Sequence, residues 1–228
     1  MKRILVLTLA LIAIFSFSFW EQHLPLAPKE VQQHFKAECD SFFTEGCGLY
    51  TNLIHSMIVI KDGQVVYENY SVGNSPKELH VMWSASKTFT ATAIGFAVQE
   101  GLLSVDDKVV SFFSEDELPA PENQSEWLKQ MTIKDLLIMS SGFEKDMVAL
   151  EGCRHYIYDW TKEQLSYDVI FEPGSQYKYN SGNTYLLSAI ITTVNGQKTS
   201  DYLETRLFKP LGIKDYYWEE SPVGITAG

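Results

Sequence analysis

The sequence predicts a mixed α/β fold, because one clear β-hairpin is followed by a series of helical patterns. The hairpin is predicted where two β-rich runs, 56–60 and 65–70, flank a turn that contains Asp62-Gly63. The longest helical pattern begins at Ser84 and keeps apolar residues at helical spacing until Gly101, which provides a C-terminal stop. With 228 residues, of which 45% are hydrophobic, the chain can form one sizeable core and a second lobe.

The first 20 residues are expected to direct export, and residues 21–228 to form one domain. Met1-Lys2-Arg3 is positively charged, Ile4–Trp20 is an unbroken apolar run, and Ser16-Phe17-Ser18 offers small residues for cleavage. A cleaved signal peptide is favoured over an uncleaved anchor, although the run is close to the shortest that can span a membrane. Either way, the rest of the chain is expected in the periplasm or outside the cell, and only the N-terminal segment would contact a membrane.

Composition excludes several classes of partner. A net charge of −11 repels phosphate backbones, so no nucleic-acid partner is expected. The five histidines show no His-x-x-x-His spacing, and neither a Cys-x-x-Cys pair nor a nucleotide-binding glycine motif is present, so no metal or cofactor is expected. Cys39 and Cys47 are close enough in sequence to form a disulfide, which would leave Cys153 without a disulfide partner.

Helical patterns occupy most of the remaining chain. A short helix is expected before the hairpin, and 114–130 reads as an acidic, proline-containing loop. Thr132 and Asp135 form a capping-box pattern that starts a helix ending at Gly142, with Met139 in the core. Residues 146–169 give no clear pattern. The short helix before the hairpin is expected at 28–37, and two further helices are expected at 185–194 and 201–208.

The chemistry is suggested by Ser84-Ala85-Ser86-Lys87, at the start of the helix that ends near Gly101. Three residues apart on a helix, the Ser84 hydroxyl and the Lys87 amine share one face, and a suitably placed amine can accept the proton of a nucleophilic serine. The alternative is that Ser84 is only the N-cap of a buried helix. Ser175 and Lys178 have the same spacing, but they follow the turn Pro173-Gly174 and start no helical pattern.

Several ordered motifs together resemble the β-lactamase-related serine hydrolases, which include class C β-lactamases, D-alanyl-D-alanine peptidases, family VIII-type esterases and 6-aminohexanoate-dimer hydrolases. The matching stretches are Ser84–Thr90 with Glu100–Leu103, Met131–Leu137 with Ser140–Gly142, Pro173-Gly174 with Tyr179–Ser181 and Leu186-Leu187, and Pro210–Gly212.

The resemblance implies that Ser84 is the acylated nucleophile, Lys87 its proton partner, and Tyr179 the phenol that deprotonates Ser84 and returns a proton to the leaving group. Ser181 takes the third, substrate-binding place of the family's Tyr-x-Asn element, with a hydroxyl in place of an amide.

The resemblance also implies an architecture: an antiparallel sheet with flanking helices, and a helical lobe inserted after the Ser84 helix, with a cleft between them. Relatives carry a Lys-Thr-Gly or His-x-Gly strand downstream that donates the second oxyanion-hole amide. No such motif follows Tyr179. The chain is therefore expected to be the N-terminal part of a longer protein, with its C-terminal strands missing, and to be poorly stable and nearly inactive by itself.

The predicted function is that of an exported serine hydrolase that cleaves small ester, amide or peptide-like bonds, β-lactams among them, through an acyl-enzyme. The alternatives are a non-catalytic module that binds cell-wall peptides and an inactive, truncated homologue. Ser181 and the missing third motif favour these alternatives. The presence of all three proton-handling side chains, Ser84, Lys87 and Tyr179, favours the enzyme.

Overall fold

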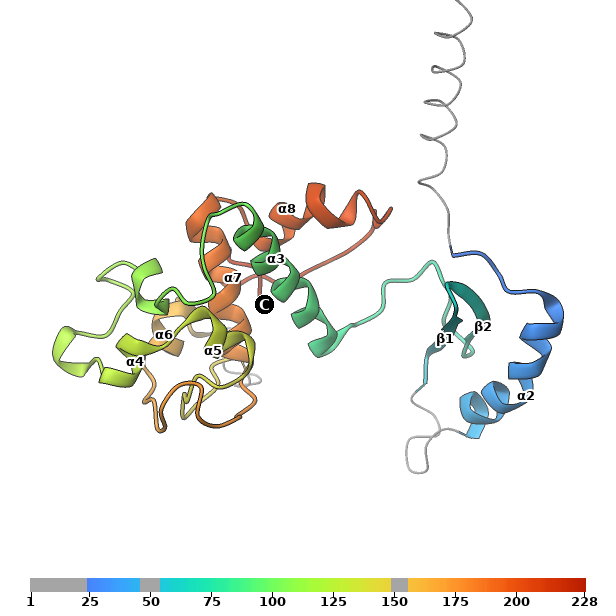
Figure 1. The fold of residues 1–228 in the computed structure, drawn as a ribbon, viewed down its shortest axis with the longest axis horizontal. Coiled ribbons are helices and arrows are strands. Elements are labelled where there is room, and N and C mark those ends of the chain that lie inside the picture. The colour runs from blue at the N-terminus through green and yellow to red at the C-terminus, as the bar shows by residue number, and fades with distance from the viewer. Residues whose placement is uncertain (1–23, 46–53, 149–155) are drawn as a thin grey trace, which may run out of the picture. The chain divides into compact units, whose positions relative to one another are not determined.

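The computed structural model describes residues 24–45, 54–148 and 156–228, which form two compact units, one ending at His80 and the other beginning at Val81. The predicted leader, together with Cys47 and Cys153, lies outside the described residues. Among the helices that are described, none combines the length and the apolar character needed to cross a membrane. Each unit is described by itself below (Figure 1).

The first unit contains helix α2 (Lys29–Glu45) and an antiparallel hairpin of β1 (Ser56–Lys61) and β2 (Gln64–Tyr70). Asp62 and Gly63 both have positive φ, 52° and 74°, which is the turn conformation that an Asp-Gly pair favours. The predicted hairpin is confirmed. It is the only sheet within the described ranges, and its two strands pair in the antiparallel sense that was expected.

Helix α2 and the segment before it are tied to β2. The Ala27 amide donates to the carbonyl of Val65 at 2.9 Å, and the Tyr67 hydroxyl donates to Asp40 of α2 at 3.0 Å. Val65, Val66 and Tyr67 are buried in succession, where alternation in the sequence predicted a single buried face. The helix is longer than the predicted 28–37. Cys39, on α2, is buried and its thiol is free.

The second unit is helical and is built around α7 (Ser181–Asn195), which is buried over most of its length. Helices α3, α5, α6 and α8 contact α7, as Figure 1 shows for the green α3 and the orange α7. Their bounds are Lys87–Gln99 for α3, Ile133–Leu137 for α5, Trp160–Ser166 for α6 and Thr199–Leu203 for α8, which continues into a π-helical turn, Glu204–Phe208. Ile94, Leu136, Leu186 and Ile190 lie in the shared core.

The predicted capping box begins α5. The Thr132 hydroxyl accepts the Asp135 amide at 3.3 Å, and the Asp135 carboxylate accepts the Thr132 amide at 2.8 Å. The predicted end at Gly142 is wrong, since α5 stops at Leu137 and Met139 takes a left-handed φ of 56°. Met139 is half-buried and does not belong to the buried core predicted for it.

Two short helices were not predicted. Helix α4 (Glu126–Gln130) lies in the stretch expected to be a loop, and Ser125 caps it by accepting the Leu128 amide at 3.1 Å. Helix α6 lies in the stretch without a clear pattern, capped by Asp159. Each spans less than two turns, too few residues for an apolar period to show in the sequence.

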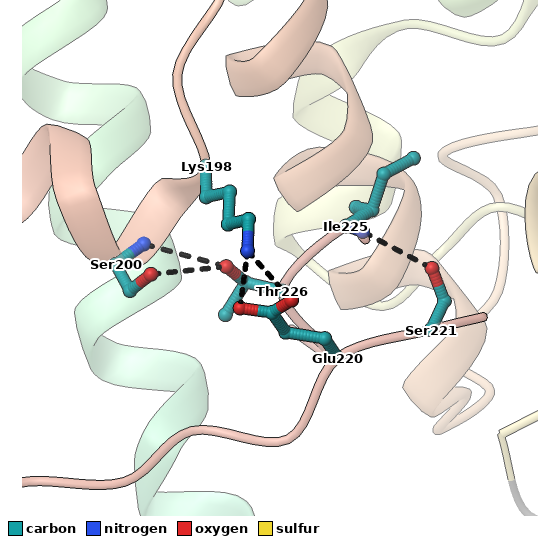
Figure 2. Close-up of polar contacts among 6 residues, drawn as sticks. All are labelled: Lys198, Ser200, Glu220, Ser221, Ile225 and Thr226. Atoms are coloured by element: carbon teal, nitrogen blue, oxygen red, sulfur yellow. Dashed lines mark hydrogen bonds and ion pairs between the residues drawn. The ribbon is translucent and has the colours of Figure 1, made fainter. Parts of the chain in front are cut away.

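The C-terminal segment folds back on α8 as a tight turn held by polar contacts (Figure 2). The Lys198 amine pairs with both carboxylate oxygens of Glu220, at 2.8 and 2.7 Å, and the Ser200 amide donates to the Thr226 hydroxyl at 3.4 Å. Across the turn, the Ile225 amide donates to the Ser221 hydroxyl at 3.2 Å. These contacts explain why a segment without helix or strand character in its sequence has a defined place in the fold.

Candidate active site

Ser84 lies in a short 3-10 helix, Trp83–Ser86, that leads directly into α3. Trp83 has a left-handed φ of 46°, a conformation that costs a residue with a side chain about 1–2 kcal/mol. The Ser86 hydroxyl donates to the Trp83 carbonyl at 2.8 Å and holds this turn. The result is an exposed Ser84 at the N-terminal end of α3, where the helix dipole favours negative charge.

Lys87, the first residue of α3, contacts Ser84 as the spacing predicts. Its amine donates to the Ser84 Oγ at 3.2 Å, and the side chain is half-buried. The predicted placement of the hydroxyl and the amine on one face is confirmed.

The phenol of Tyr179 completes the cluster from a position 95 residues further along the chain. Its oxygen lies 2.6 Å from the Ser84 Oγ, and the Lys87 Nζ lies 5.4 Å from the centre of the ring. The structure therefore brings the three predicted side chains to one place.

The surroundings lower the pKa of Tyr179 below its ordinary value. Burial by itself raises this pKa, but hydrogen bonding from the Ser84 hydroxyl and the Lys87 amine, the positive charge of that amine, and the Ser181 hydroxyl together outweigh it. A phenol with a lowered pKa is a better proton acceptor near neutral pH than a free tyrosine. Ser181, the predicted substrate-binding residue, is half-buried at the start of α7 and adjoins Tyr179 by this contact.

Lys178 fixes the backbone immediately before Tyr179. Its amide donates to the Met139 carbonyl at 2.8 Å, and its amine donates to the carbonyls of Phe143, at 2.9 Å, and Glu144. Ser175, the other half of the second Ser-x-x-Lys match, donates its hydroxyl to the Glu172 carbonyl at 2.5 Å. This match is a structural turn, as its context predicted.

The chain after Tyr179 is fixed by side chains that sequence reasoning missed. The Asn180 side-chain amide donates to the Lys145 carbonyl at 2.7 Å. The Asp146 carboxylate accepts the amides of Ser181, at 2.6 Å, and Gly182, at 3.0 Å, at the start of α7. An acidic group here satisfies amides that have no partner within the helix and complements the helix dipole. Nothing in the sequence marks Asp146 as the cap of a helix that begins 35 residues later.

A buried pair ties the turn after α5 to α7. The Ser141 hydroxyl donates to the side-chain oxygen of Asn183 at 2.8 Å, and both side chains are at most 1% exposed. The Ser140 hydroxyl donates to the Gln176 carbonyl at 2.7 Å. Together these contacts fix the turn that carries the Met139 carbonyl, which in turn accepts the amide of Lys178.

A family model for beta-lactamases matches residues 55–227, a range that contains Ser84, Lys87 and Tyr179. The chain belongs to the beta-lactamase family. The resemblance inferred from the motifs is thereby confirmed, as is the mixed α/β fold class, and the family is one of hydrolases.

Three similar proteins show how much of the family's length this chain represents. Protein flp of Staphylococcus aureus strain MW2 is 28% identical over 170 residues, which is 70% of this chain and 33% of that protein. The octameric penicillin-binding protein homologue from Pyrococcus abyssi is 24% identical with a TM-score of 0.64, over 81% of this chain and 44% of that one. A D-stereospecific amidohydrolase from a Streptomyces species is 20% identical with a TM-score of 0.54, over 64% of this chain and 46% of that one.

The beta-lactamase-family chain described here thus spans less than half the length of each of these three relatives. The two structural likenesses concern the fold alone, since both identities are low. The residue roles rest on the geometry of Ser84, Lys87 and Tyr179, and they are developed as a proposal below.

Proposed function

We propose that this chain carries the nucleophile and the proton-transfer groups of an exported serine hydrolase that forms an acyl-enzyme on Ser84. The observation that carries the proposal is the contact of one hydroxyl with two proton-handling groups: Ser84 Oγ lies 2.6 Å from the Tyr179 phenol and 3.2 Å from the Lys87 amine. A nucleophile with a base in hydrogen-bond reach, and a third group that adjusts the base, is the arrangement that nucleophilic catalysis needs.

In this mechanism Tyr179, as phenolate, accepts the proton of Ser84 while Oγ attacks the substrate carbonyl. The Lys87 ammonium stabilises the phenolate charge. The Ser84 amide, at the start of a helix and without an intrahelical acceptor, would donate to the oxyanion that forms. Tyr179 then gives its proton to the leaving group as the tetrahedral intermediate collapses, and water hydrolyses the ester in a second cycle of the same proton transfers.

The proposed substrates are small esters, amides or peptide-like bonds, with β-lactams as one subclass. Family membership supports acyl transfer as the reaction class. Ser181, beside Tyr179, is proposed to contact the substrate. Its hydroxyl can donate one hydrogen bond and accept others, but the side chain is shorter than that of the asparagine it replaces. No metal or cofactor takes part in these steps.

The test is covalent labelling of the full chain with a fluorophosphonate probe, followed by peptide mass spectrometry. We expect the adduct on Ser84 and expect Ser84→Ala to abolish it. Ser175→Ala is the matched control, because Ser175 has the same Ser-x-x-Lys spacing but its hydroxyl is hydrogen-bonded to the Glu172 carbonyl. This control is expected to label like the parent. Labelling that is spread over several serines, or that survives in Ser84→Ala, contradicts the proposal.

A non-catalytic module that binds cell-wall peptides makes a different prediction. Such a module binds a D-alanyl peptide or penicillin equally well with or without Ser84 and forms no adduct. Measuring reversible binding beside covalent labelling, in the parent and in Ser84→Ala, separates the two functions. Binding without any adduct in the parent would favour the module.

A further inference from the structure

Two histidines outside the candidate active site meet in the first unit. His55 immediately precedes β1, and His80 ends the loop that follows β2. The Nδ1 of His55 lies 3.2 Å from the Nε2 of His80, and the ring centres are 4.9 Å apart with the planes nearly perpendicular. Both side chains are exposed, so solvent reaches the point at which the two nitrogens face each other.

We propose that His55 and His80 form a binding site for one divalent transition-metal ion of the kind that imidazole prefers, such as Ni²⁺, Cu²⁺ or Zn²⁺. With metal–nitrogen bonds of about 2.0–2.1 Å, two ligand nitrogens stand about 3.3 Å apart in a tetrahedral site and about 2.9 Å apart at right angles. The observed 3.2 Å lies between these separations. The separation of the two nitrogens thus matches the one that a single ion bound by both rings requires.

The backbone supports the pair. The Ser71 amide donates to the His55 carbonyl at 2.9 Å, and this bond joins the start of the loop 71–80 to the residue before β1. Within the loop, the Asn74 amide donates to the Ser71 carbonyl at 3.0 Å, and the Glu78 amide donates to the Ser75 carbonyl at 3.3 Å. His55 is thus joined to the start of this loop, His80 lies at its end, and local backbone bonds order the turns between them.

Metal binding needs a change of tautomer in one of the two rings. Without metal, one ring donates its N–H to the other across the 3.2 Å gap. For both facing nitrogens to bind the ion, that proton moves through solvent to the far nitrogen of the same ring, and no covalent bond to carbon changes. The net charge of −11 adds a general attraction for cations.

The site would be open. Among the described residues, no group of three or more His, Cys, Asp or Glu side chains is placed to hold a metal, so water would fill the remaining positions. Along the chain, His80 is followed by Val81, Met82 and Trp83 and then by Ser84. A bound ion would therefore restrain the N-terminal side of the segment that leads to the proposed nucleophile. This inference does not depend on the proposed hydrolase activity.

The experiment is isothermal titration of the full chain with NiCl₂, with His34→Ala as the matched control, since His34 is an exposed histidine on α2. We expect one ion bound per chain in the parent and in His34→Ala. His55→Ala and His80→Ala should each weaken binding by at least about tenfold, because the second ligand acts at high effective concentration. His55→Gln, checked by circular dichroism, repeats the test with a polar side chain of similar reach.

Hydrogen exchange provides the structural readout. Added Ni²⁺ should slow exchange of the loop amides in 71–80 in the parent and in His34→Ala, but not in His55→Ala. Equal affinity in the His55, His80 and His34 variants would overturn the proposal. So would titration without detectable heat at millimolar Ni²⁺, or slowed exchange that persists in His55→Ala.

Discussion

At the scale of single residues, Tyr179 shows how neighbours set the chemistry of a side chain. The residue is 48% exposed, yet its phenol oxygen contacts Ser84, and the amine of Lys87 lies over the face of its ring. Burial and the neighbouring groups act on its pKa in opposite directions, and the net result is a lowered value. The proposed base is therefore a property of three side chains and not of the tyrosine alone.

This arrangement predicts the pH dependence of probe labelling at Ser84. The phenolate is the active form, so the labelling rate should rise with pH and reach half its maximum below about 10, the pKa of a free tyrosine. Lys87→Met removes the amine that lowers the pKa and leaves the burial that raises it. The midpoint should therefore move to higher pH.

Lys145→Met is the control for this pH profile, because that amine lies 5.6 Å from the ring centre of a different tyrosine, Tyr167. Its profile should match the parent. A midpoint that does not move in Lys87→Met would show that the amine has no influence on the phenol.

Asp146 is predicted to position Tyr179 by fixing the start of α7. Its two carboxylate oxygens accept two amides, so Asp146→Asn, with only one acceptor oxygen, leaves one amide without this partner. We expect a loss of about 0.5–2 kcal/mol in the free energy of unfolding and slower labelling at Ser84. Denaturant unfolding and labelling rates measure the two effects.

Asp159→Ala separates positioning from stability in this test, because asparagine would keep the single acceptor oxygen that Asp159 uses. Asp159 caps α6 by accepting the Lys162 amide at 3.0 Å, away from Tyr179 in sequence and in its contacts. This variant should lose similar stability while labelling at the parent rate. If both variants label equally fast, Asp146 is a structural cap without a positioning role.

At the scale of elements, the close approach of α6 to α7 depends on Gly182. A Cβ at this position would come within 1.9 Å of the side-chain oxygen of Gln164, which is fully buried and accepts the Met147 amide at 2.9 Å. The Gln164 side chain also donates to the Lys145 carbonyl at 3.2 Å. The side chain thus has little freedom to move away.

Gly182→Ala should therefore destabilise the protein, by about 1–3 kcal/mol for overpacking alone. The matched change is Gly95→Ala on α3, where a Cβ meets nothing within 4 Å. This change should stabilise by about 0.5–1 kcal/mol, because alanine favours helix over glycine. Thermal and denaturant unfolding compare the two. Equal effects in the two variants would mean that the packing at Gly182 is looser than described.

Local sequence signals predicted the elements that contain them. Asp62-Gly63 predicted the hairpin turn, and Thr132 with Asp135 predicted the start of α5. The end of α5 was mispredicted because apolar spacing continues past Leu137, while the chain turns at Met139 to meet the segment that ends at Lys178. That turn is imposed by contacts distant in sequence, which a local pattern does not contain.

At the scale of the whole molecule, the site combines one local and one long-range signal. Ser84 and Lys87 could be predicted from spacing, since one helical turn joins them. Tyr179 could be predicted only from the family resemblance, because nothing local connects it to Ser84. Asp146 and Asn183 had no signal of either kind, and Asn180 lay within the matched stretch Tyr179–Ser181 without an assigned role. Their roles follow from segments that pack together only in the folded chain.

The beta-lactamase-family chain described here spans 33% of protein flp, so its activity is best measured as single steps and not as turnover. The central claim is that Ser84, Lys87 and Tyr179 act as one unit. The most direct measurement is the rate constant for fluorophosphonate labelling of Ser84 in the parent, in Tyr179→Phe, in Lys87→Met and in the double variant.

The account predicts that each single variant labels about 10²- to 10⁴-fold more slowly than the parent, the range for loss of general-base assistance. It also predicts that the double variant labels no more slowly than the slower single variant, because groups that act together are not additive. A Tyr179→Phe rate equal to the parent rate, or losses that multiply in the double variant, would contradict it.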